Sequence, residues 1–143
     1  MRVLLDTNVI LDSMLQRPPW HLDADAILQA AGRGEVTCAV TALSLANLFY
    51  IGRRIVGTSR ARTDVRTCLH TLQILAVDRQ VLVDADVLGG SDFEENIQIA
   101  AAVAVALDAV VTRDPSGFSH APIAVWSPSI LLQRLAQQHS PGS

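Results

Sequence analysis

Short apolar runs alternate along this chain with longer segments of mixed polarity. Short apolar runs bounded by turn residues are typical of buried strands, and the longer segments repeat apolar residues at helical spacing. We therefore expect strands at residues 2–5, 36–40, 74–77, 109–112 and 123–125. Helices are expected at about 8–14, 22–31, 41–55, 59–72, 78–88 and 91–107, with a last one introduced by Ser127–Ser129.

Capping residues fit these boundaries but leave two helix starts open. Thr41 or Ser44 can begin the third helix, and Ser91 or Asp92 the sixth, because both residue types accept hydrogen bonds from first-turn N–H groups. Short buried strands that alternate with helices indicate a parallel sheet covered on both faces. The expected fold is α/β, a three-layer α/β/α sandwich with a central parallel sheet.

The length of 143 residues fits a single domain. We expect it to span residues 1–138, with 139–143 as a flexible tail. The chain is 50% hydrophobic and 17% charged, which is typical of a globular protein. No apolar run predicts a membrane span, and Asp6 interrupts the first one, which argues against a signal peptide. Cys38 and Cys68 are expected to be free thiols of a cytoplasmic protein, with one disulfide as the alternative.

The net charge of −3 excludes an overall basic surface for nucleic acid. All 11 basic residues are arginines, however, and five of them fall within residues 53–66 with one acid, Asp64. The simplest interpretation is a solvated helical surface. The alternative is a phosphate-contacting arm, because guanidinium groups bind phosphate in bidentate fashion.

Acidic residues occur in three places that a parallel sheet could bring together. Asp6 follows the first strand and Asp114 follows the fourth, and ligand sites in such sheets lie beyond the carboxyl ends of strands. Asp92, Glu94 and Glu95 occupy the first turn of a helix that is apolar almost all round and therefore expected to be buried. Singly, each acid could be a cap or a turn residue. Together they predict an oxygen-ligand site for Mg²⁺ or Mn²⁺ and metal-assisted phosphodiester hydrolysis.

Four segments in order, LLDTNVILD, TALSLANLFY, DFEENIQIAAAVA and VVTRDPSGF, resemble the PIN-domain ribonucleases, especially the VapC-like bacterial toxins. Their order and intervals cover nearly the whole chain, and the closing VWSPSILLQRL is similar to one PIN subgroup. The resemblance implies an α/β/α fold and RNA cleavage that depends on Mg²⁺ or Mn²⁺. It also implies homodimers and neutralisation by an antitoxin protein.

The resemblance assigns catalytic and metal-binding roles to acids of this chain. The first acid is Asp6, completed by Thr7 and by Asn8, whose amide would orient it. The helix acid maps best on Glu95, with Asp92 and Glu94 as competitors, and the last acid on Asp114. The Thr112 hydroxyl is expected to bond Asp6 or a water on the metal.

One position departs from the family pattern, because Asn47 stands where the second acid, commonly Glu, is expected. An amide brings no charge and cannot act as a base, so a second tightly held metal is in doubt, and Asp92 would supply the missing charge. For substrate binding, Arg113 would contact the scissile phosphate. Residues 53–66, beginning with Arg53 and Arg54, would contact RNA or the antitoxin.

Three functions compete on these observations. The first is a metal-dependent endoribonuclease, the toxin of a toxin–antitoxin pair. The second is a non-catalytic PIN module that binds RNA or protein, for which Asn47 is the support. The third is a phospho-acceptor domain, which needs a lysine that this chain lacks and a second acid where Asn8 stands.

Overall fold

Five strands form one parallel sheet at the centre of the computed structural model, which describes residues 1–140. Their order across the sheet is β3-β2-β1-β4-β5. Every neighbouring pair is parallel, and β1 lies between β2 and β4. The strand bounds are β1 (Arg2–Leu5), β2 (Thr37–Thr41), β3 (Gln73–Leu75), β4 (Ala109–Val111) and β5 (Ala124–Trp126).

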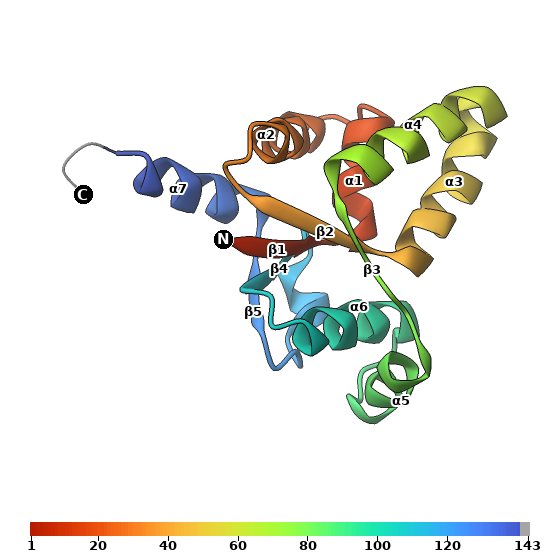
Figure 1. The fold of residues 1–143 in the computed structure, drawn as a ribbon, viewed down its shortest axis with the longest axis vertical. Helices are drawn as coiled ribbons and strands as arrows, with labels where there is room; N and C mark the ends of the chain where they lie inside the picture. Colours follow the sequence, from red (N-terminus) through yellow and green to blue (C-terminus); the bar gives the residue numbers. More distant parts are fainter. Residues whose placement is uncertain (141–143) are drawn as a thin grey trace.

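Helices cover both faces of the sheet, which confirms the predicted three-layer α/β/α sandwich (Figure 1). One face packs against α1 (Thr7–Met14), α2 (His21–Gly32), α3 (Ala42–Val56), α4 (Thr58–Thr71) and α7 (Pro128–Gln138). The other packs against α5 (Arg79–Val87), α6 (Phe93–Ala104) and the 3₁₀ turn η1 (Pro115–Phe118), which the sequence pattern did not predict.

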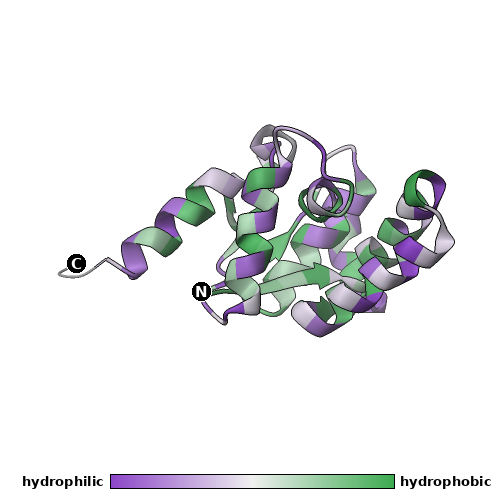
Figure 2. Cartoon of the chain, turned by 90° about the horizontal axis from the view of Figure 1, so that it is seen from above, coloured by the Kyte–Doolittle hydropathy of each residue, from purple (hydrophilic) through white to green (hydrophobic). Residues whose placement is uncertain are grey.

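The two cores follow from the alternation of side chains along each strand. In β1, Val3 and Leu5 face the α1 side, whereas Leu4 faces the α6 side, and all three are fully buried. A strand buried on both faces reads as a continuous apolar run. Apolar residues accordingly concentrate on the sheet and the inward sides of the helices (Figure 2).

The structure settles both open helix starts. Thr41 caps α3, since its hydroxyl accepts from the Ser44 N–H at 3.0 Å. Asp92 caps α6, since its carboxylate accepts from the Glu95 N–H at 3.1 Å.

The end of α6 differs from the prediction. The helix was expected to reach Leu107 and to be buried all round, but it ends at Ala104, and Val103 and Val105 are 44% and 40% exposed. Ala106 adopts a positive φ of 54°, which reverses the chain and lets the Leu107 N–H bond to the Ala102 carbonyl. The apolar run thus continues through a turn that places Leu107 in the core.

Cys38 and Cys68 are free, as predicted, and both are buried. Burial raises the thiol pKa of Cys38 to about 12 and that of Cys68 to about 11, so both are protonated and inert at neutral pH. Within residues 1–140, no helix is long and apolar enough to cross a membrane. Of the tail predicted at 139–143, residues 141–143 lie outside the described residues.

Candidate active site

Asp6 lies where β1 ends and α1 begins, with its N–H bonded to the Val111 carbonyl of the neighbouring strand. Its side chain is 7% exposed. Burial raises the pKa of Asp6, and hydrogen bonds to its carboxylate from Thr112, Gln98 and the N–H groups of Asn8 and Thr7 partly offset that rise. A buried carboxylate with a raised pKa at the end of a central strand is a candidate functional group.

The Thr112 hydroxyl connects Asp6 with Asp114. It donates to Asp6 Oδ2 at 2.9 Å and accepts from the Asp114 N–H at 3.1 Å. Thr112 directly follows β4, whose neighbour in the sheet is β1, and its side chain is fully buried. The expected contact between Thr112 and Asp6 is present, and it sets the distance between two predicted acids.

Three acids at the start of α6 face the same place. Glu94 Oε1 accepts from the Thr7 hydroxyl at 3.3 Å, which ties α6 to α1. Asp92, besides capping α6, borders the same hollow as Glu94 and Glu95. Glu94 and Glu95 are adjacent in the chain and leave the helix in different directions, but the first turn of α6 meets α1 closely enough for all three acids to reach the hollow.

Glu95 and Asp114 approach each other over Gly117. A Cβ atom at Gly117 would lie 3.2 Å from Glu95 Oε1 and 3.2 Å from Asp114 Oδ2, so both carboxylates border the same small space. The pKa of Glu95 is raised by burial first, and then by the negative charges of Asp92, Asp6, Asp114 and Glu94. Like charges at this range favour protonation or a bound cation.

The hollow has a volume of about 150 Å³ and opens between the starts of α1 and α6, with a contribution from α3. It is lined by Asp6, Thr7, Asn8, Leu11, Ile51, Asp92, Glu94, Glu95 and Gln98. Among residues 1–140, no three acidic, histidine or cysteine side chains are close enough, as they stand, to hold a metal ion. The donor chemistry nonetheless fits Mg²⁺ or Mn²⁺, because mutually repelling carboxylates meet at one space with no cationic side chain among the lining residues.

Gln98 is a site residue that the sequence analysis did not select. It is 2% exposed, its Nε2 donates to Asp6 Oδ1 at 3.4 Å, and its Oε1 has no hydrogen-bond partner. The sequence does mark Gln98 as unusual, since it is the one polar residue between Ile97 and Leu107. Gly117 is a second omission, and nothing in its local sequence indicates the two carboxylates that meet beside it.

Two predicted supporting residues have limited roles here. The Asn8 side chain is exposed, and it is the backbone N–H of Asn8 that favours the ionised form of Asp6. Asn47 lies on α3, one helical turn before Ile51, which lines the hollow. This position gives Asn47 the same helical face as Ile51, although Asn47 itself is not among the residues that line the hollow.

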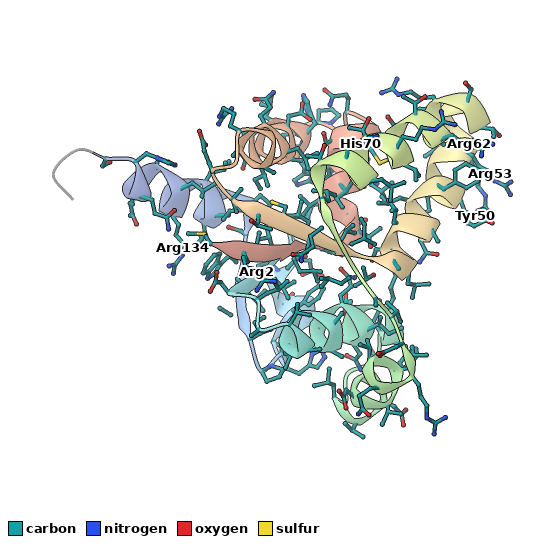
Figure 3. All side chains as sticks on the ribbon, in the orientation of Figure 1. Arg2, Tyr50, Arg53, Arg62, His70 and Arg134 are labelled. Atoms are coloured by element: carbon teal, nitrogen blue, oxygen red, sulfur yellow. The ribbon has the colours of Figure 1, made fainter. Side chains whose placement is uncertain are left out.

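The predicted substrate-binding arginines lie in two different settings. The Arg113 Nε is 2.9 Å from Asp12 Oδ2, and its guanidinium stacks 4.1 Å from the centre of the Trp20 ring. The phosphate contact expected of Arg113 stays a prediction. Arg53 and Arg54 are exposed near the end of α3. The Arg53 guanidinium stacks 5.0 Å from the centre of the Tyr50 ring, and these two side chains project outward from α3 (Figure 3).

Solved structures of low sequence identity share this fold. VapBC2 from Rickettsia felis is 16% identical with a TM-score of 0.68, covering 89% of this chain and 98% of that one. A toxin–antitoxin complex from Klebsiella pneumoniae is 19% identical with a TM-score of 0.67, covering 88% and 97%. VapC20 from Mycobacterium tuberculosis, a toxin that cleaves the sarcin–ricin loop, is 11% identical with a TM-score of 0.62, covering 76% and 86%.

The comparison with curated proteins found no significant match. A family model, in contrast, matches residues 2–116, which include every acid of the hollow and both strands whose ends carry Asp6 and Asp114. That model describes the PIN domain. The chain therefore belongs to the PIN domain family.

Proposed function

We propose that this chain is an endoribonuclease that hydrolyses RNA phosphodiester bonds with Mg²⁺ or Mn²⁺, as the toxin of a toxin–antitoxin pair. One observation carries the proposal: Glu95, on α6, lies near both Asp6 and Asp114, which follow the neighbouring strands β1 and β4. Ligand sites of parallel sheets lie at this edge.

Asp6, Glu95 and Asp114 would hold the cation, with Asp92 at the rim adding the charge that Asn47 does not bring. A bound divalent cation would supply activation of water for attack on phosphorus and stabilisation of the departing oxygen. Thr112 and Gln98 keep Asp6 oriented through their hydrogen bonds. Thr7 does the same for Glu94 through its hydroxyl. Such outer hydrogen bonds fix the direction in which carboxylate ligands present their oxygens.

The proposed substrate surface is the arginine-rich end of α3 and the adjoining α4. Arg53, Arg54 and Arg62 are exposed there, on a chain whose net charge is negative (Figure 3). Exposed guanidinium groups attract the phosphate backbone of RNA, and added salt shortens the distance over which this attraction acts. We assign this surface to RNA backbone contact.

The partners follow from the relatives. The Klebsiella pneumoniae neighbour is a toxin–antitoxin complex, and VapC20 is a toxin that cleaves the sarcin–ricin loop. By this analogy we propose that the chain forms a homodimer, is neutralised by a cognate antitoxin protein and acts in the cytoplasm, where its RNA substrate would be.

The test is cleavage of extracted ribosomal RNA by an excess of purified protein, with Mn²⁺, with Mg²⁺ and with a chelator. The proposal predicts cleavage that needs the metal and is abolished by Asp6→Asn, and growth arrest on expression that the same substitution relieves. The alternative function, a PIN module that binds RNA or protein without cleaving, is supported by Asn47. Absence of cleavage with either metal would contradict the nuclease and favour that alternative.

A further inference from the structure

Asp12 is a buried acid that the hollow does not include. It lies on α1, is 1% exposed, and meets one arginine at each carboxylate oxygen. Arg17 Nε is 2.9 Å from Oδ1, and Arg113 Nε is 2.9 Å from Oδ2. Both Nε groups and Asp12 Oδ1 lack an aligned hydrogen-bond partner, so the attraction is mainly that of opposite charges.

Such a cluster is a poor way to stabilise a core. Removing charges from water is costly, and incomplete hydrogen bonding leaves that cost largely uncompensated. Apolar residues of similar volume would serve this part of α1 at least as well, because its buried positions at Ile10, Leu11 and Met14 are apolar. The arrangement is therefore better explained by what it holds in place.

The two arginines connect Asp12 to both sides of the hollow. Arg113 directly precedes Asp114 and follows Thr112, and the Trp20 ring covers its guanidinium at 4.1 Å. Arg17 reaches back along α1, where its Nη2 donates to the Asn8 carbonyl at 3.5 Å. Asn8 lines the hollow two residues after Asp6.

Charge holds this cluster together. Asp12 with Arg17 and Arg113 carries one net positive charge. Part of this cluster is buried, where opposite charges attract more strongly than they do in water. Asp12 therefore attracts both arginines and the segments of chain that carry them.

We propose that Asp12 is a positioning residue, which fixes the segment carrying Asp114 through Arg113 and the start of α1 through Arg17. This proposal rests on the proposed nuclease function, since it names what holds that site together. Asp12 touches neither the substrate nor the cation and acts through the two arginines alone.

The test compares Asp12→Asn with the wild-type protein in two measurements. Amide hydrogen exchange of the metal-free protein should become about tenfold faster in residues 112–118. Mn²⁺ affinity, measured by calorimetry, should fall by about tenfold or more, as for other groups that orient ligands. Arg113→Met is the second variant, because it frees Asp114 while Arg17 still pairs with Asp12.

Ile27→Val is the matched control, since Ile27 is fully buried in α2 and does not line the hollow. It should lower the melting temperature without accelerating exchange in residues 112–118 selectively. The proposal would be overturned if Asp12→Asn or Arg113→Met kept both the hydrogen-exchange rates of the wild type in residues 112–118 and its Mn²⁺ affinity. If the nuclease function is wrong, the wild-type protein will not cleave RNA. The hydrogen-exchange measurement does not depend on cleavage, so it still tests whether Asp12 fixes residues 112–118.

Discussion

Thr112 donates a 2.9 Å hydrogen bond to Asp6 across the ends of two neighbouring strands, although 106 residues separate them in the chain. The same hydroxyl accepts the N–H of Asp114. One fully buried side chain thereby sets the relative placement of two acids that the proposed function needs.

Thr112→Val keeps the shape of this side chain and removes its hydroxyl. Asp6 Oδ2 and the Asp114 N–H then lose a partner, which should cost about 1–3 kcal/mol of the free energy of unfolding. Loss of an orienting hydrogen bond should also lower single-turnover RNA cleavage by about 10- to 100-fold. The control is Thr67→Val, because the Thr67 hydroxyl donates to the Thr63 carbonyl within α4 at an exposed position. Equal cleavage by the two variants would contradict the role of Thr112.

Glu95→Gln should stabilise the metal-free protein at pH values above the folded-state pKa of Glu95. Burial and four neighbouring acids raise the pKa of Glu95 in the folded state. Between the unfolded and folded pKa values the native state therefore binds more protons, and stability falls as pH rises through that window. At pH values above this window, the ionised Glu95 of the wild type is repelled by the neighbouring acids, whereas the neutral side chain of Glu95→Gln is not.

Thermal melts at acidic and at neutral pH check this expectation. The melting temperature of Glu95→Gln should exceed that of the wild type at neutral pH, and the difference should vanish once Glu95 is protonated in both states. Added Mn²⁺ should stabilise the wild type more than the variant. A variant less stable than the wild type at neutral pH would show that Glu95 is not under repulsion.

Gly117→Ala tests the close approach of Glu95 to Asp114. The added methyl group would lie 3.2 Å from an oxygen of each carboxylate, which displaces at least one of them. RNA cleavage should fall, because small displacements of catalytic groups are costly. Gly32→Ala is the control, since a Cβ there meets nothing within 4 Å. If both variants cleave like the wild type, the two carboxylates do not need this space.

Asn96→Ala should destabilise the protein through the link between α5 and α6. The Asn96 amide donates to the carbonyls of Ala85 and Gly89, and its Oδ1 lies 2.8 Å from His120 Nε2. Because Asn96 is 3% exposed, its loss leaves buried carbonyls unpaired, at about 1–3 kcal/mol. Urea unfolding measures this loss, and Gln80→Ala, which removes an exposed hydrogen bond to Asp84 on α5, should cost much less.

The fold was predictable from sequence because its determinants are local. Continuous apolar runs fixed β1 and β4, and the polar caps Asp78 and Ser127 marked the starts of α5 and α7. The end of α6 was missed because the apolar pattern continues past Ala104 into a turn. Hydrophobicity alone does not distinguish the last turn of a helix from the turn that follows it.

The candidate site was predictable only as a set of residue types at strand and helix ends. Asp6, Glu95 and Asp114 could be selected because the end of a parallel strand or the start of a helix is a defined place in such a fold. The pairing of Arg113 with Asp12 depends on rotamers and on packing against Trp20. Such contacts between distant residues leave no periodic signal in the sequence.

Calorimetric titration of the purified protein with Mn²⁺ measures whether Asp6, Glu95 and Asp114 form one cation site. If they do, the wild type binds Mn²⁺, and Asp6→Asn, Glu95→Gln and Asp114→Asn each weaken binding by about tenfold or more. Binding of equal strength in the wild type and all three variants, or no binding by the wild type, would contradict a shared cation site.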